Sequence, residues 1–252
     1  MIVPHLAFHM SVARELANRM GNRLIDADRG AFYLGSTGPD MRILSRADRM
    51  SSHYFDLDCL EHQSSTESFF RAHGDLGDPS KLDDTTAAFV AGYLTHLVID
   101  EVWITDIYRP FFGPESALGG DARANVMDRV LQYEMDLQRR RDRPAMEEIR
   151  EQLLATNPSV RVDFVEGEML ARWRVVVVDM LSRPPDWGRF GWTASRFLAV
   201  AGVSTDGEIE DFMKTLPSLL EETKAHVGSE HMEAFLANAN VLTLKTLEEY
   251  LS

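Results

Sequence analysis

The sequence predicts an all-α protein, a multi-helix bundle, on three observations. Apolar residues recur at helical spacing in most segments of the 252-residue chain, whereas strand-like alternation lasts for only a few residues. Loops rich in glycine and proline separate these segments, at residues 34–40, 74–84 and 182–192. We therefore expect a single all-helical domain over residues 1–252, with a core in 1–143 and additional helices of 144–252 packed on it.

The first half of the chain contains four predicted helices, at residues 5–20, 24–34, 62–73 and about 84–109. Pro4 suits the first turn of the first helix, and Gly21 stops it. Asp84 or Thr85 can cap the long apolar helix, which must end near Arg109 because Pro110 follows.

The second half contains five more, at residues 121–141, 146–156, 164–182, 206–226 and 228–251. Pro144 opens the second of these, and Pro217 should interrupt the fourth. The run VVVV (175–178) alone would suggest a strand. It has no turn signals around it, so helix is the better interpretation.

Composition limits the possible partners and compartments. The net charge of −14 argues against nucleic acid and against anionic membrane surfaces. The single cysteine, Cys59, excludes an internal disulfide framework. We find no signal peptide and no window of 18 uncharged apolar residues, so we expect a cytoplasmic protein without a transmembrane segment. Nothing in the sequence indicates the oligomeric state.

An ionisable pair interrupts the long apolar helix in the stretch GYLTHLVIDEVW (92–103). His96 and Asp100 are four residues apart, so they project from one face of the helix. A buried carboxylate needs a compensating charge, and no Lys or Arg lies within one turn. The compensation could be a protonated histidine, a metal ion, or an arginine from elsewhere in the chain: Arg42, Arg46 or Arg109.

Other residues of the same chemical types favour the metal. His5 and His9 are again four apart on an amphipathic helix, and His53 lies in MSSHYFDLD. Asp40 ends the glycine loop GSTGPD, where a proline-rigidified turn can aim a carboxylate inward. Imidazole and carboxylate without thiolate suit zinc, manganese or iron in a hydrolytic site. A structural His–Asp or Arg–Asp network remains the alternative.

The order of these motifs resembles the zinc-dependent phospholipase C family. The matching stretches are PHLAFHMSVARELA (4–17), FYLGSTGPD (32–40), SHYFD (52–56) and GYLTHLVIDEVW (92–103). The resemblance implies an all-helical fold and a cluster of up to three zinc ions that hydrolyses phosphodiesters. Residues 1–143 would then be the metal-bearing part of the chain.

Carried over from the family, Asp40, His53, His96 and Asp100 would bind one metal. Asp100 would bridge to a second ion held by His9, and His5 would be a further ligand or a capping residue. The family's secreted enzymes also use an N-terminal tryptophan and two histidines and a glutamate further along the chain. Here only Asp106 stands near the first of those later positions. One or two ions are therefore expected.

We thus expect a phospholipase C-like hydrolase that acts on a lipid or small-molecule phosphoester. Zinc is the expected metal, with manganese or iron as alternatives. Asp40 would also accept the proton of the attacking water, and Arg109 would contact phosphate. A non-catalytic helical binding or scaffold protein, with a structural metal or none, is the alternative, as is a hydrolase of a different ester or of a phosphomonoester. His226 and His231 should lie outside the cluster.

Overall fold

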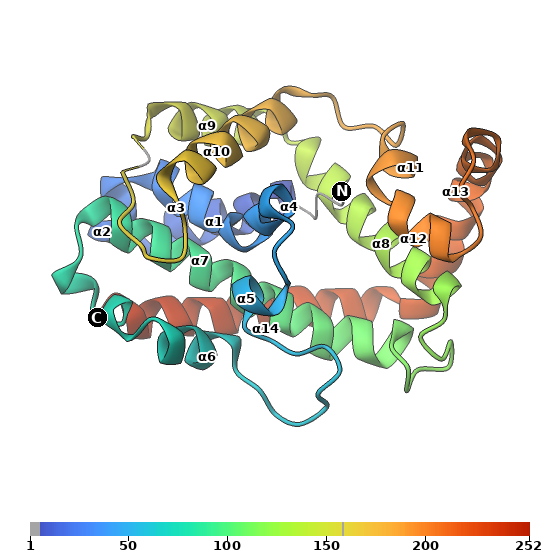
Figure 1. Ribbon diagram of the computed structural model, residues 1–252, viewed down its shortest axis with the longest axis horizontal. Coiled ribbons are helices and arrows are strands. Elements are labelled where there is room, and N and C mark those ends of the chain that lie inside the picture. The colour runs from blue at the N-terminus through green and yellow to red at the C-terminus, as the bar shows by residue number, and fades with distance from the viewer. Residues whose placement is uncertain (1–5, 158) are drawn as a thin grey trace.

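Figure 1 shows the computed structural model, which describes residues 6–157 and 159–252. The protein is all-α, and no strand occurs within these ranges. The α-helices are α1 (Leu6–Met20), α2 (Arg23–Ala27), α3 (Arg29–Gly35), α4 (Arg42–Ser45), α5 (Met50–His53), α6 (Ser65–Ala72), α7 (Asp84–Trp103), α8 (Ala122–Arg140), α9 (Arg143–Ala155), α10 (Gly167–Ser182), α11 (Phe190–Thr193), α12 (Ser195–Val200), α13 (Asp206–Val227) and α14 (Ser229–Tyr250). The tighter and wider turns are η1 (Gly38–Met41), η2 (Gly74–Leu76), η3 (Pro79–Lys81) and η4 (Ile104–Phe112).

Helix α7 is the central element of the bundle, as Figure 1 shows. Its sequence is apolar around almost the whole circumference, so neighbours must cover it on all sides. Helices α1, α2, α3, α6 and α14 pack against it. A second, smaller apolar cluster joins α8 to α11, α12 and α13, with Phe190 and Leu198 fully buried in it. The space between these two packed groups is where the candidate site lies.

Several predicted boundaries were wrong for identifiable reasons. The segment 24–34 forms two helices, because the Asp28 side chain accepts the Ala31 N–H and caps a new start. The long helix is capped by Asp83 rather than Asp84 or Thr85. It continues past Pro110 as the π-helix η4, in which the Gly113 N–H donates to the Tyr108 carbonyl.

Two other differences concern the second half of the chain. Pro217 does not interrupt its helix: α13 runs unbroken from Asp206 to Val227 and packs against α8. The short helices α11 and α12 follow the predicted break at 182–192 and were not anticipated. The VVVV run lies inside α10, so its helical interpretation is confirmed.

One helical stretch, Asp84–Phe112, is long and apolar enough to cross a membrane by length and composition alone. However, 89% of its apolar window is buried inside the structure. A helix at the centre of a bundle passes the same test, so this is weak evidence for a membrane span.

Two glycines set the contact between α3 and α7. A Cβ atom on Gly92 would lie 2.0 Å from the Phe32 carbonyl oxygen, and one on Gly35 would lie 2.0 Å from that of Phe89. Only glycine lets two helix backbones approach this closely. The contact brings the end of α3, and the η1 turn that follows it, against the face of α7 that carries His96.

Gly92→Ala should therefore lower the free energy of unfolding by about 1–3 kcal/mol, because the clash is with backbone that cannot move aside. Gly207→Ala is the matched control. A Cβ there meets no atom within 4 Å, and alanine in a helix should be neutral or stabilising by up to about 1 kcal/mol. Chemical denaturation of both variants measures the difference. Equal stabilities would contradict the close contact.

Candidate metal centre

His96 and Asp100 project from α7 one turn apart, with the His96 Nε2 atom 3.8 Å from Asp100 Oδ2. The His96 ring is fully buried, and its Nδ1 lies 2.9 Å from the Ser36 carbonyl oxygen. A carbonyl can only accept, so Nδ1 carries the proton and Nε2 presents its lone pair to the cluster. That buried Nε2 has no hydrogen-bond partner among the described residues.

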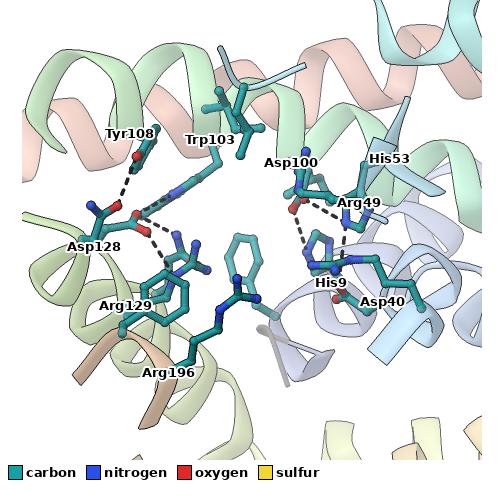
Figure 2. Close-up of a pocket in the computed structure, with 18 of the residues that line it drawn as sticks. His9, Asp40, Arg49, His53, Asp100, Trp103, Tyr108, Asp128, Arg129 and Arg196 are labelled. Carbon is teal, nitrogen blue, oxygen red and sulfur yellow. Dashed lines mark hydrogen bonds and ion pairs between the residues drawn. The ribbon is translucent and has the colours of Figure 1, made fainter. Parts of the chain in front are cut away.

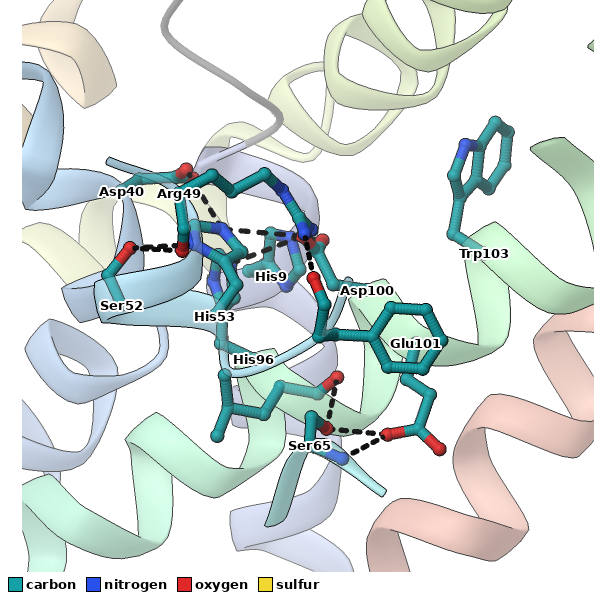
Figure 3. Close-up of polar contacts among 12 residues, drawn as sticks. His9, Asp40, Arg49, Ser52, His53, Ser65, His96, Asp100, Glu101 and Trp103 are labelled. Atoms are coloured by element: carbon teal, nitrogen blue, oxygen red, sulfur yellow. Dashed lines mark hydrogen bonds and ion pairs between the residues drawn. The ribbon is translucent and has the colours of Figure 1, made fainter. Parts of the chain in front are cut away.

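Three other elements bring side chains to the same point, as Figure 3 shows. Helix α1 supplies His9, η1 supplies Asp40 and the end of α5 supplies His53, all buried. His9 Nε2 lies 3.4 Å from Asp100 Oδ1, and His53 Nε2 lies 3.4 Å from Asp100 Oδ2. His53 Nε2 is also 3.6 Å from Asp40 Oδ1. His5 lies outside the described residues.

These separations of 3.4–3.8 Å suit metal ligands better than hydrogen bonds. A good N–H···O hydrogen bond spans about 2.7–3.2 Å. Two donors on a tetrahedral zinc ion, each about 2.0–2.1 Å from it, lie about 3.3 Å apart. The His9 and His96 rings also stack, with centroids 4.0 Å apart, an arrangement that two protonated imidazoles would oppose.

Two overlapping sets of three ligand atoms could each hold an ion: His9, His96 and Asp100, and Asp40, His53 and His96. His96 has one free lone pair and can serve only one ion at a time. Asp100 has two oxygens, Oδ1 facing His9 and Oδ2 facing His53 and His96. Three protein ligands leave one position of a tetrahedral ion open, as catalytic zinc sites require.

An arginine also reaches Asp100. Arg49 Nη2 lies 2.9 Å from Asp100 Oδ2, and Arg49 Nη1 donates to the Phe55 carbonyl. This arginine is none of the three candidates taken from the sequence. One guanidinium neutralises one carboxylate, but it cannot account for the unpartnered lone pair of His96 or the unpartnered Oδ2 of buried Asp40.

The pKa shifts of the donors favour the protonation states that bind a cation. Burial, reinforced by His9, lowers the pKa of His96 to about 3, and burial and Arg49 lower the pKa of His53 well below its usual value. Although burial raises the pKa of Asp100, the neighbouring His96, His9, His53 and Arg49 outweigh it and hold that pKa well below normal. Neutral imidazoles beside an ionised carboxylate are the protonation states that metal binding needs.

A buried aspartate of α8 fixes the start of α1. Asp136 Oδ1 accepts the backbone N–H groups of Ala7 and Phe8 at 2.8 and 3.3 Å, next to His9 in the chain. A carboxylate at a helix N-terminus satisfies free N–H groups and favours the helix dipole. Burial, opposed by Arg140, raises the pKa of Asp136 to about 6.

Four of the donors, His9, Asp40, His53 and Asp100, line one end of a cavity of about 820 Å³, shown in Figure 2. This volume suits a drug-sized ligand. The walls combine apolar side chains, among them Phe8, Ile99, Trp103 and Phe235, with five arginines: Arg42, Arg46, Arg49, Arg129 and Arg196. At the other end of the cavity the buried Asp128 accepts the Trp103 Nε1–H at 3.0 Å.

The remaining sequence candidates lie elsewhere. Arg109 packs over Phe55 and donates to the backbone carbonyls of Asp56, Leu57 and Cys59, so it holds that loop and does not line the cavity. Asp106 accepts the Asn238 side-chain N–H. His226 and His231 contact the carbonyls of Phe111 and Val227.

Sequence reasoning missed Arg49, Asp128 and Asp136. Arg49 precedes His53 by four residues, so the helical spacing that paired His96 with Asp100 also pairs these two. Asp128 and Asp136 are eight apart on α8, about two turns, and therefore share one face of that helix. Nothing in the sequence shows that this face is buried against α7 and α1.

The zinc-dependent phospholipase C family model matches residues 8–156, which is more than half of the chain and includes His9, Asp40, His53, His96 and Asp100. No curated relative and no solved structure matched the chain.

Asp100→Asn should lower zinc affinity by more than about 100-fold, because it replaces an ionised ligand that faces three imidazoles. Elemental analysis of protein purified without chelator and thermal unfolding with added zinc measure this. At a zinc concentration of 100 times Kd, zinc binding should raise the free energy of unfolding of the wild-type protein by about 2.7 kcal/mol. The variant should lose this stabilisation. Asp106→Asn is the control, because Asp106 lies outside the cluster. This variant should keep the bound zinc and the stabilisation by zinc.

Arg49→Gln distinguishes the two explanations of Asp100, a metal ligand or the partner of Arg49 alone. If the site holds a metal, this variant should still bind zinc, because Arg49 is not a donor. A wild-type protein that cannot be loaded with zinc, manganese or iron would instead leave the Arg49–Asp100 pair as the whole explanation.

Asp136→Asn should remove a pH-dependent loss of folding stability. Because the pKa of about 6 is raised above the usual 3.8, the folded state binds more protons than the unfolded state between these values, and stability falls as pH rises through that window. As the pH rises from 4 to 7, the free energy of unfolding of the variant should increase relative to that of the wild type by up to about 3 kcal/mol. Urea unfolding at both pH values tests this, with exposed Asp75→Asn as control. A constant difference between variant and wild type would contradict it.

Proposed function

Because the chain belongs to the zinc-dependent phospholipase C family, we propose that it is a metal-dependent hydrolase of phosphoester bonds and that its metal is zinc. The observation that carries the proposal is the convergence of three imidazoles and two carboxylates at the end of a cavity of about 820 Å³. Their mutual distances suit metal ligands. The apolar walls of the cavity suit the lipid part of a phospholipid.

His53, His96 and Asp40 would hold one ion, and His9 and Asp100 would hold a second. From the described residues this second ion would have only two protein ligands, so it would be the weaker of the two. Zinc, when bound, supplies a Lewis acid for the phosphoryl oxygens and lowers the pKa of a water molecule. The protein's contribution is to hold the donors in a buried, shaped site.

Asp40 is the proposed general base. It is almost fully buried, and its Oδ2 atom has no hydrogen-bond partner among the described residues, whereas Oδ1 faces His53. Burial, opposed by His96, raises the pKa of Asp40. Oδ2, the oxygen without a partner, is the atom that would take the proton of the attacking water.

Arg49 is proposed to bind the phosphoryl group. It lines the cavity next to the donors, and its side chain is about one-fifth exposed. When a cation neutralises Asp100, the guanidinium no longer compensates that carboxylate alone and can donate to the phosphoryl oxygens.

A non-catalytic helical binding protein is the second candidate. The 2.9 Å contact between Arg49 and Asp100 favours it, because this pair gives the partly buried carboxylate a partner without any metal. In that case the imidazoles would be structural, and adding zinc would change neither activity nor stability.

A panel of chromogenic phosphodiester, phosphomonoester and phospholipid substrates, with zinc or manganese added, tests the proposal. We expect metal-dependent hydrolysis of a phosphodiester. Asp40→Asn should lower kcat by about 100–10,000-fold, because the amide cannot take the proton. Arg49→Gln should lower kcat/KM by about 10–100-fold while zinc remains bound. Asp106→Asn should leave activity unchanged.

Zinc-loaded wild-type protein that hydrolyses none of the panel would contradict the proposed activity and favour the binding protein. Hydrolysis of the phosphomonoester alone would assign the site to a different ester. Full activity of Asp40→Asn would remove Asp40 from the role of base.

A further inference from the structure

The cavity has a second polar end, opposite the metal donors in Figure 2. It is formed by Arg129 and Asp128 of α8, Arg196 of α12, and Trp103 and Tyr108 of the α7–η4 stretch. None of these residues belongs to the candidate metal groups. The metal-dependent mechanism therefore leaves this end of the cavity without a role.

Two guanidiniums face this end. Arg196 is exposed at the cavity, and within residues 6–157 and 159–252 it has no hydrogen-bond or ion-pair partner. Arg129 lies over the Phe197 ring, 4.7 Å from its centroid, and its Nη1 donates to the Gln132 side chain at 2.8 Å. These contacts hold the guanidinium of Arg129 in place beside the free guanidinium of Arg196.

Asp128 anchors this end: its Oδ1 is hydrogen-bonded, whereas its Oδ2 has no hydrogen-bond partner among the described residues and faces Arg129. Its Oδ1 accepts the Trp103 Nε1–H at 3.0 Å and the Gln132 Nε2–H at 2.6 Å, and Oδ2 lies 3.5 Å from Arg129 Nε. The side chain is fully buried. With two arginines and one aspartate, this end has a net positive charge, which favours an anion over a quaternary ammonium group.

We propose that Arg129 and Arg196 form a second anion subsite, so that the substrate is a phosphoester with a further anionic group. One phosphoryl group would lie at the metal donors, and a second phosphate or a carboxylate would lie between the two guanidiniums. The apolar walls between the two ends, including Phe8, Trp103 and Phe235, would contact the part of the molecule that joins them. This rests on the proposed function only in assigning the first phosphoryl group to the metal end.

The experiment compares non-hydrolysable probes on zinc-loaded protein. Alkane-α,ω-bisphosphonates with linkers of three to eight carbons are titrated calorimetrically against alkylphosphonates of the same length. An ω-carboxyalkylphosphonate distinguishes carboxylate from phosphate at the second end, and an ω-trimethylammonioalkylphosphonate offers a cation there. The linker series finds the length that spans the cavity.

The best bisphosphonate should bind about 10-fold or more tightly than its monophosphonate, beyond the twofold statistical advantage of a symmetric probe. Arg196→Gln should remove this advantage and leave monophosphonate binding unchanged. Because Arg196 is exposed and unpartnered, the variant should fold normally. Arg129→Lys keeps a charge near Asp128 but loses the planar fork, and it should reduce the advantage in part. Arg189→Gln, an exposed arginine that does not line the cavity, should bind as the wild type does.

Equal affinities for both probes at every linker length would overturn the proposal, as would an advantage that survives in Arg196→Gln. Tighter binding of the trimethylammonio probe would assign this end to a cationic group of the substrate instead. Protein that hydrolyses phosphodiesters yet binds the probes equally contradicts the subsite alone. Protein that shows the bisphosphonate advantage yet hydrolyses nothing contradicts the proposed function and supports the subsite.

Discussion

The carboxylate of Asp100 is the charge on which the arrangement of this cavity depends. It stands on the most apolar helix of the protein, where an uncompensated charge costs several kcal/mol. Groups from separate parts of the chain converge on it: His9 from α1, Arg49 and His53 from α5 and its start, and His96 from α7 itself. The first hundred residues must therefore fold back on α7 for the charge to be tolerated.

Backbone contacts make that convergence possible. The absence of Cβ atoms at Gly35 and Gly92 lets α3 lie directly on α7, which places the Ser36 carbonyl where it fixes the tautomer of His96. On α8, the Asp136 carboxylate accepts the N–H groups of Ala7 and Phe8 in the first turn of α1 and so sets the position of His9. The donors are thus held by contacts outside the cluster, and their geometry does not require the metal to create it.

The all-α class and the main helices could be predicted, because helical period is a local property of the sequence. The set of residues that meet at the site was predicted from the resemblance to the family, since their spacing alone left a structural network open. The continuation of the helix past Pro110 could not be predicted. The π-helix η4 accommodates this proline through a wider turn, which depends on packing. Arg49 and Asp128 also escaped prediction. Each acquires its role through a partner far away in the chain, Asp100 for the first and Trp103 for the second. Arg109 failed to reach the cavity because the carbonyls of a neighbouring loop bind its guanidinium.

The charge of the cavity is opposite to that of the molecule. The protein carries a net charge of −14, but five arginines and four aspartates line the cavity, and one zinc ion would raise their net charge from +1 to +3. An extended polyanion would meet the acidic surface along its whole length and be repelled. A small anion that fits within about 820 Å³ would meet the cationic interior instead, where apolar walls weaken screening by solvent. Selection between small and large phosphoesters would thus come from where the charges lie.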